Sequence, residues 1–178
     1  ASHVGAHRPA DALIPACRHA GPRAPARVSD DWTDVLSALS ASGARFLVVG
    51  AHAMAVHGVP RGTQDLDVWV DPTAENADRV WKALAWFGAP LETLRLTPED
   101  FTRRDVVVQL GVPPLRIDLL TTISGLPDFA AAWAGRREES VAGRTVPFLG
   151  RDDLVANKRA AGRTKDLADL EALGESHA

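Results

Sequence analysis

The sequence predicts a mixed α/β fold of the α+β kind, in which a sheet of short strands is flanked by helices. Two observations predict it. Short apolar runs alternate along the chain with longer stretches of helical periodicity. The run from Asp65 to Val70 alternates strictly, as a strand does when its two faces differ. The 178 residues show no internal repeat and no second domain, so we expect residues 30–178 to form a single domain.

The first 29 residues are expected to lie outside this domain. They are rich in Ala, Pro, Arg and His and lack apolar periodicity, so residues 1–29 are interpreted as a flexible or extended arm. Its four arginines either contact RNA or a partner, or are simply solvated. A helix follows, with its N-cap at Ser29 to Asp31 and its end at Gly43. Its buried stripe is formed by Trp32, Val35, Leu36 and Leu39.

The segment from Phe46 to Asp71 is expected to form the centre of the domain. Phe46 to Val49 is an apolar strand that stops at Gly50, where the backbone can turn sharply. A short helix from Ala51 to His57 is then broken by Gly58, Pro60 and Gly62. The alternating strand from Asp65 to Val70 follows. Its acidic side chains lie on the face opposite to Leu66, Val68 and Val70.

The remaining elements are predicted in order along the chain. A helix opens at Pro72 and Thr73 and stops at Gly88, and one further helical turn starts at Thr97. The later elements are strands at 106–110 and 115–120, a short helix at 129–133, a hairpin at 139–141 and 145–148 that turns at Gly143, and helices at 151–158 and 165–173.

Three aspartates are the candidates for chemistry. Asp65 and Asp67 lie two apart on one strand, so their carboxylates share a face about 7 Å apart at the backbone. Such neighbours repel each other, and at least one is hard to ionise unless a cation lies between them. Asp118 is a lone acid on the later apolar strand, and Mg²⁺ takes oxygen ligands of this kind together with substrate phosphates. The alternatives are a solvated strand face, although Asp is disfavoured in strands, and a simple ion pair of Asp118 with Arg116.

These residues carry a resemblance to a known family. Gly50-Ala51, a spacer, Asp65-Leu66-Asp67-Val68 and an isolated Asp118 resemble the pattern of the nucleotidyltransferase superfamily of the polymerase-beta type. A longer string is similar to small bacterial nucleotidyltransferases related to the toxins of abortive-infection and toxin–antitoxin systems. That string contains His57-Gly58, Arg61, Thr63, Asn157-Lys158, Ala161-Gly162-Arg163 and Asp166. The resemblance extends from about Asp31 to Leu173, and Ala51 departs from it because the family usually has Gly or Ser at this position.

The resemblance implies a nucleotidyltransferase-like mixed sheet. It also implies an enzyme that uses Mg²⁺ or Mn²⁺ to move a nucleoside monophosphate from an NTP, such as ATP, to an acceptor hydroxyl. The implied catalytic and metal-binding residues are Asp65, Asp67 and Asp118, with Asp118 near the acceptor hydroxyl as ligand or base. The implied nucleotide-binding residues are Gly50 and Ala51, through their backbone N–H groups, with Arg61, Thr63 and Lys158.

Several of these polar residues also have simpler interpretations. Arg61 is equally well a plain loop arginine, and Lys158 a residue of a solvated helix face. His52 and His57 are interpreted as satisfied structural histidines. Asp166 is interpreted as an acid near a helix start, where the helix dipole favours it.

Composition limits the class of partner. The formal net charge is −3, so the chain is not a generally basic nucleic-acid binder. The single cysteine, Cys17, excludes an intrachain disulfide and fits a reducing cytoplasm. No apolar run is long enough to span a membrane, so no membrane partner is expected.

The acceptor stays open between RNA such as tRNA, a protein, and a small molecule such as an aminoglycoside. Two rival functions are also open. One is a non-catalytic nucleotide- or partner-binding module of a toxin–antitoxin pair, which would have an antitoxin-like protein partner. The other is a metal-dependent phosphodiesterase, which uses similar carboxylates but does not release pyrophosphate from an NTP.

Overall fold

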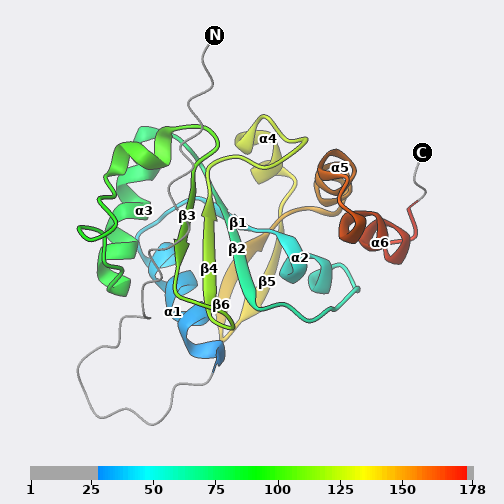
Figure 1. Ribbon diagram of the computed structural model, residues 1–178, viewed down its shortest axis with the longest axis horizontal. Coiled ribbons are helices and arrows are strands. Elements are labelled where there is room, and N and C mark those ends of the chain that lie inside the picture. Colours follow the sequence, from blue (N-terminus) through cyan, green and yellow to red (C-terminus); the bar gives the residue numbers. More distant parts are fainter. Residues whose placement is uncertain (1–27, 176–178) are drawn as a thin grey trace.

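Residues 28–175 are described by the computed structural model of the chain, in which one sheet is flanked by helices (Figure 1). The strands are β1 (Phe46–Val48), β2 (Asp65–Val70), β3 (Val107–Leu110), β4 (Arg116–Leu120), β5 (Arg137–Val141) and β6 (Arg144–Phe148). The helices are α1 (Val28–Ala41), α2 (Gly50–Val56), α3 (Ala74–Phe87), α4 (Phe129–Ala134), α5 (Arg151–Ala161) and α6 (Thr164–Ala172), with a 3₁₀ helix η1 (Pro98–Thr102). The predicted mixed sheet with flanking helices is confirmed.

The sheet has the strand order β3-β4-β2-β1-β6-β5. β2 pairs with β4 and β1 pairs with β6 in parallel, whereas the other neighbours are antiparallel. The register of β2 against β4 places Asp65 opposite Arg116 and Asp67 opposite Asp118. Two of the predicted site residues are therefore direct neighbours across a pair of parallel strands in the middle of the sheet.

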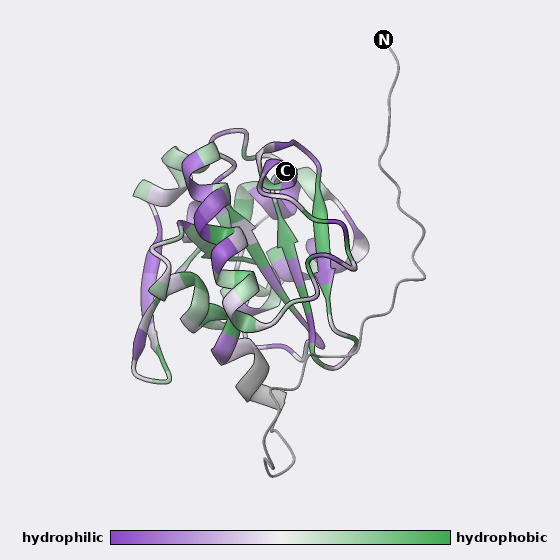
Figure 2. Cartoon of the chain, turned by 90° about the vertical axis from the view of Figure 1, so that its left-hand side faces the viewer, coloured by the Kyte–Doolittle hydropathy of each residue, from purple (hydrophilic) through white to green (hydrophobic). Residues whose placement is uncertain are grey.

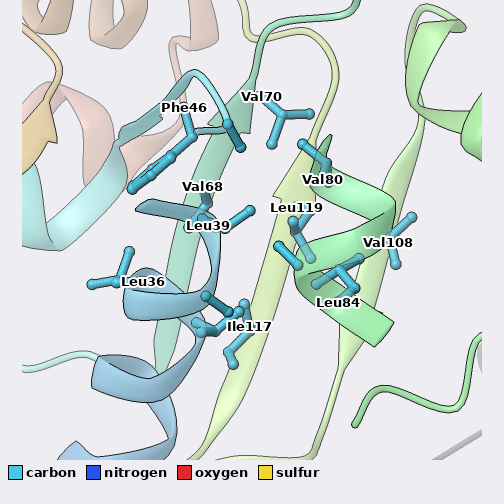
Figure 3. Packing of buried hydrophobic residues seen from close by; sticks show 14 of the residues in the cluster. Leu36, Leu39, Phe46, Val68, Val70, Val80, Leu84, Val108, Ile117 and Leu119 are labelled. Atoms are coloured by element: carbon cyan, nitrogen blue, oxygen red, sulfur yellow. The ribbon is translucent and has the colours of Figure 1, made fainter. Parts of the chain in front are cut away.

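One face of the sheet packs against α1, α3 and η1. Along β2, residues that point into this core alternate with residues on the opposite face of the sheet. Leu66, Val68 and Val70 all point into the core, as predicted. Figure 3 shows Leu36 and Leu39 of α1 and Val80 and Leu84 of α3 lying against Val68, Ile117 and Leu119 of the sheet. Burial of these side chains, at about 25 cal/mol per Å² of apolar surface, holds the strands in register.

The other face of the sheet is covered by α2, α4, α5 and α6. Its core is built around Trp69, whose indole N–H donates to the Thr121 carbonyl at 3.2 Å and whose ring meets Phe129 edge to face. Figure 1 shows α3 and the α5–α6 pair on opposite sides of the sheet. In Figure 2 the hydrophobic residues gather along the middle of the sheet and the hydrophilic ones on the outer sides of the helices. Because Asp65 and Asp67 share a face with Trp69, they lie on this second side.

Helix α1 begins earlier than predicted. The predicted N-cap at Ser29 to Asp31 is wrong, since the helix already starts at Val28. The last two residues of the predicted arm are thus helical. Residues 1–27 lie outside the described residues, and the division of the chain into an arm and a single domain stays a prediction.

Other boundaries differ by few residues. β1 ends at Val48, because Gly50 already begins α2, and α5 continues to Ala161, where Gly162 ends it in the left-handed conformation at φ +60°. Gly88 ends α3 in the same way at φ +89°, as predicted. Within residues 28–175, no helix is long and apolar enough to cross a membrane.

Candidate functional site

A cavity of about 550 Å³ opens at the beginning of β2. It is bounded by the start of α2, the loop before β2, the first half of β2 and the start of α6. The residues that line it are Ala51, Arg61, Gly62, Thr63, Gln64, Asp65, Asp67 and Lys165. The structure thus brings together five of the predicted site residues, namely Ala51, Arg61, Thr63, Asp65 and Asp67.

Gly50 is required at this site by Asp67. Gly50 begins α2 with φ +63°, a conformation that L side chains rarely adopt, and a Cβ at this position would collide with Oδ2 of Asp67. The adjacent Val49 N–H donates to the Asp67 carbonyl at 3.0 Å. The strand–turn–helix segment therefore folds closely around Asp67. The predicted contact of the Gly50 and Ala51 backbone with phosphate stays a prediction.

Arg116 is the one cation bound to the predicted acids in the described part of the chain. Its Nη2 lies 2.7 Å from Oδ2 of Asp65, and its Nε lies 3.1 Å from Oδ1 of Asp118. The predicted pairing of Arg116 with Asp118 is confirmed, and Asp65 joins it. The second contact is not aligned as a hydrogen bond. Arg116 Nε and Asp118 Oδ1 are therefore buried without a hydrogen-bond partner in residues 28–175. Oδ1 of Asp65 is also buried without such a partner.

Asp67 and Asp118 are harder to ionise than ordinary aspartates. Burial raises the pKa of Asp67, and the nearby Asp65 raises it further, while Lys165 and Arg116 oppose the shift. Burial also raises the pKa of Asp118 against the effect of Arg116. Asp67 takes part in no ion pair among the residues described. Three carboxylates on neighbouring strands thus share one close cation, and negative charge faces the cavity.

The two histidines of this region differ. The ring Nε2 of His57 lies 2.8 Å from the Leu149 carbonyl, so the prediction of a structural histidine is confirmed for His57. His52 packs edge to face on Trp32, but its Nε2 is buried and lacks a partner within residues 28–175. Burial lowers the pKa of His52, although Asp67 nearby opposes the shift. A neutral imidazole at this position adds no positive charge to the site.

Lys158 lies away from the cavity lining. Its Nζ is 3.0 Å from Oδ1 of Asp166 and 2.7 Å from Oδ2 of Asp169, and only 3% of its side chain is exposed. The predicted contact of Lys158 with a triphosphate would therefore break two buried ion pairs, and the geometry argues against it. Asp166 lies near a helix start, as predicted, and also accepts hydrogen bonds from Lys158 and Arg163.

Sequence reasoning assigned no role in the site to Lys165 or Asp169. Lys165 lies in the first turn of α6 and lines the cavity, where its charge acts on Asp67. Asp169 pairs with Arg61 of the cavity, with Oδ1 3.3 Å from Nε. The signal for Asp169 was its spacing, because acids at Asp166 and Asp169 lie on one face of a helix. The signal for Lys165 was a basic residue at the start of the last predicted helix, which is the same kind of signal as that for Lys158.

The three aspartates do not form a preassembled metal centre. Among the residues that the structure describes, no group of three or more His, Cys, Asp or Glu side chains is arranged to hold a metal ion. The predicted triad is present on adjacent strands, and the Arg116 guanidinium contacts oxygens of two of its members, Asp65 and Asp118.

Comparison with known proteins bears on the fold. No protein-family model and no curated protein matches the chain. Its structure is similar to a crystal structure of a Thermotoga maritima protein that is provisionally described as a nucleotidyltransferase. The TM-score is 0.52 and the sequence identity 15%, over 79% of this chain and 88% of the other. At this identity the likeness shows the fold alone: the mixed sheet and its helices form a nucleotidyltransferase-like fold.

Proposed function

We propose that this protein is a metal-dependent nucleotidyltransferase that moves a nucleoside monophosphate from an NTP to an acceptor hydroxyl. The observation that carries the proposal is the charge pattern of the cavity. Its lining contains Asp65 and Asp67, with Asp118 opposite Asp67 on the neighbouring strand, and the cations Arg61 and Lys165. Carboxylates that face basic groups across a cavity suit a cation bound to phosphates.

The donor chemistry of the site fits Mg²⁺ or Mn²⁺. Carboxylate oxygens are the ligands that these ions prefer, and Oδ1 of Asp65 and Oδ1 of Asp118 are buried without a hydrogen-bond partner in the described residues. Asp67 has no ion pair there and a raised pKa, so its charge is poorly compensated. Asp65, Asp67 and Asp118 are thus the residues that would hold the ion, and Arg116 has to yield at least one of them.

The residues of this chain have separate tasks in such a reaction. Arg61 and Lys165, which line the cavity, bind phosphate oxygens. Thr63 orders the loop, because its hydroxyl lies 3.0 Å from the Asp65 carbonyl and 3.2 Å from the Asp65 N–H. Asp118 lies opposite Asp67 on the neighbouring strand, where it acts near the acceptor hydroxyl as a ligand of the ion or as the base. A bound ion supplies charge neutralisation at the triphosphate and a lowered pKa of the attacking hydroxyl.

The acceptor is RNA, a protein or a small molecule with a free hydroxyl. The sequence resemblance to toxin-related nucleotidyltransferases adds an antitoxin-like protein partner to the proposal. A second function, a non-catalytic binding module with this fold, is favoured by one observation. Arg116 ties Asp65 to Asp118, and residues 28–175 hold no ready ligand group of three acids.

The deciding experiment incubates the purified protein with each α-labelled NTP, Mg²⁺ or Mn²⁺, and a pool of total RNA or cell lysate. We expect label on an acceptor and release of pyrophosphate, both dependent on metal and both lost in Asp67→Asn. Circular dichroism of Asp67→Asn controls for folding. Nucleotide binding without transfer would favour the binding module, and phosphodiester hydrolysis without pyrophosphate release would favour a phosphodiesterase.

A further inference from the structure

A buried ion cluster joins α5 to α6. Lys158 of α5 binds Asp166 at 3.0 Å and Asp169 at 2.7 Å, and the exposed fractions of these side chains are 3%, 0% and 7%. Charged side chains are rarely buried to this extent, because removal from water costs several kcal/mol per ion. Burial of this cluster costs the domain stability, so we expect the cluster to have a role beyond packing.

The cluster is connected to the cavity at two points. Asp169 uses its second oxygen, Oδ1, to hold Nε of Arg61 at 3.3 Å, and Arg61 lines the cavity. Asp166 accepts from the Arg163 backbone N–H at 3.2 Å and from Arg163 Nε at 2.6 Å, which fixes the start of α6. Lys165 lies in that first turn and also lines the cavity. Arg61 thus contacts a buried acid directly, and Lys165 lies in the helical turn that the other buried acid fixes.

Arg61 needs such a contact because of where it lies. Its loop contains Gly58, Pro60 and Gly62 and no regular structure, so the backbone alone orders the guanidinium weakly. A half-exposed ion pair is worth little when both partners move. Here Asp169 is buried, and its Oδ2 lies 2.7 Å from Lys158 Nζ in an ion pair that is not aligned as a hydrogen bond. Burial and this ion pair restrict Asp169, so only Arg61 is on a loop that the backbone orders weakly. Since Asp169 contacts Nε, the two terminal nitrogens of Arg61, which have no partner in the described residues, are left for phosphate oxygens.

We propose that Lys158 and Asp169 are positioning residues of the nucleotide site. Lys158 holds Asp169, Asp169 orients the guanidinium of Arg61 toward the phosphates, and Asp166 fixes the turn that carries Lys165. This role rests on the proposed function and replaces direct contact of Lys158 with the triphosphate. Lys158, Asp166 and Asp169 do not line the cavity, so they position the substrate through the residues they contact.

The test compares two acids that both pair with α5, namely Asp169 within α6 and Glu175 just after it. Asp169→Asn breaks the link to Arg61. Glu175→Gln, the matched control, breaks exposed pairs with Arg151 and Arg159 and touches nothing in the cavity. The ligand is magnesium tripolyphosphate, which carries the phosphates of any NTP without a base, and its affinity is measured by calorimetry. Mn²⁺ alone is titrated separately.

We expect Asp169→Asn to weaken tripolyphosphate binding by about 10-fold or more, the scale of one lost charge-assisted contact. Its Mn²⁺ affinity is expected to stay within about twofold, because Asp65, Asp67 and Asp118 are untouched. Glu175→Gln is expected to change neither affinity. Asp169→Glu, which keeps the buried charge and therefore the fold, is expected to give an intermediate loss. Unchanged tripolyphosphate affinity in folded Asp169→Asn or Asp169→Glu would overturn the positioning role.

A double-mutant cycle separates positioning from general structural damage. If Asp169 acts through Arg61, Asp169→Asn combined with Arg61→Gln binds tripolyphosphate as weakly as Arg61→Gln alone. Losses that multiply would overturn the proposal, because they would mean that Asp169 acts independently of Arg61. A wild-type protein that binds neither tripolyphosphate nor Mn²⁺ would instead refute the proposed function itself, and the role of Asp169 with it.

Discussion

The molecule contains two groups of aspartates with opposite charge balance. The pocket acids are Asp65 and Asp67 of the cavity lining and their neighbour Asp118. Among residues 28–175 their one ion-pair partner is Arg116, which contacts Asp65 and Asp118, and burial raises the pKa of Asp67 and Asp118. The buried acids, Asp166 and Asp169, are bound by Lys158, Arg61 and Arg163, which is more cations than acids. The comparison teaches that carboxylates short of counter-charge mark where a ligand is needed, whereas fully compensated ones hold elements together.

The largest expected effect is the removal of the shared cation of the buried acids. Lys158→Met leaves Asp166 and Asp169 buried without it, and we expect a loss of about 3–5 kcal/mol in the free energy of unfolding. Lys165→Met, at an exposed lysine of α6, is the control and is expected to change it by less than about 0.5 kcal/mol. The measurement is urea unfolding of both variants. Equal, small losses would mean that the buried acids do not depend on Lys158.

The next effect concerns the pocket acids, for which added metal is the missing cation. Mn²⁺ at 100 times its dissociation constant is expected to stabilise the wild type by about 2.7 kcal/mol, because it binds only the folded state. A chelator is expected to reverse the gain, and Asp67→Asn is expected to lose it. Thermal unfolding measures these changes, with Asp152→Asn, at an exposed acid of α5, as the control that keeps the gain. An equal gain in Asp67→Asn would exclude Asp67 as a ligand.

The pocket acids also show which parts of the site a sequence can predict. The strict alternation from Asp65 to Val70 fixes both faces of β2, so the shared face of Asp65 and Asp67 follows from local pattern alone. The pairing of Arg116 with Asp118 follows in the same way, from their spacing on one strand. The parallel register that sets Asp67 beside Asp118 was not predictable, because it depends on packing of strands distant in sequence.

Lys158 shows where sequence reasoning fails. A lysine on a short helix has the same local pattern whether it reaches a substrate or a buried acid. The difference here is set by the turn at Gly162, which folds α6 back so that Asp166 and Asp169 face Lys158 and Lys165 faces the cavity. Gly50 is a similar case, since its need for glycine comes from the carboxylate of Asp67 on another element.

The two groups are also expected to respond to pH in opposite directions. Burial raises the pKa of Asp67 above its ordinary value of 3.8, so its charge costs stability above the folded pKa, and the cost vanishes as the pH falls toward 3.8. Burial would raise the pKa of Asp166 too, but hydrogen bonds from Arg163 and Lys158 outweigh it and lower that pKa. Asp166 therefore contributes stability above pH 3.8 that is lost only below it.

This difference can be measured in the metal-free protein. At pH 7, Asp67→Asn is expected to be more stable than the wild type by about 1 kcal/mol, and the gap is expected to close as the pH falls to about 4. Asp166→Asn is expected to be less stable than the wild type over the same range. Urea unfolding in the presence of a chelator gives both curves. If the difference in free energy of unfolding between Asp67→Asn and the wild type did not change with pH, the ionisation of Asp67 would cost the folded state nothing.

The smallest expected effect tests whether burial, rather than the number of contacts, decides which cation matters to the buried acids. Arg163 contacts Asp166 at 2.6 Å, closer than Lys158 does, but 61% of its side chain is exposed. Water therefore screens the pair, and Asp166 keeps Lys158 when Arg163 is removed. We expect Arg163→Ala to cost less than about 1 kcal/mol in urea unfolding, as exposed ion pairs do. A loss as large as that of Lys158→Met would mean that Arg163 supplies the counter-charge. The distinction between a buried cation that holds the acids and surface cations that only accompany them would then fail.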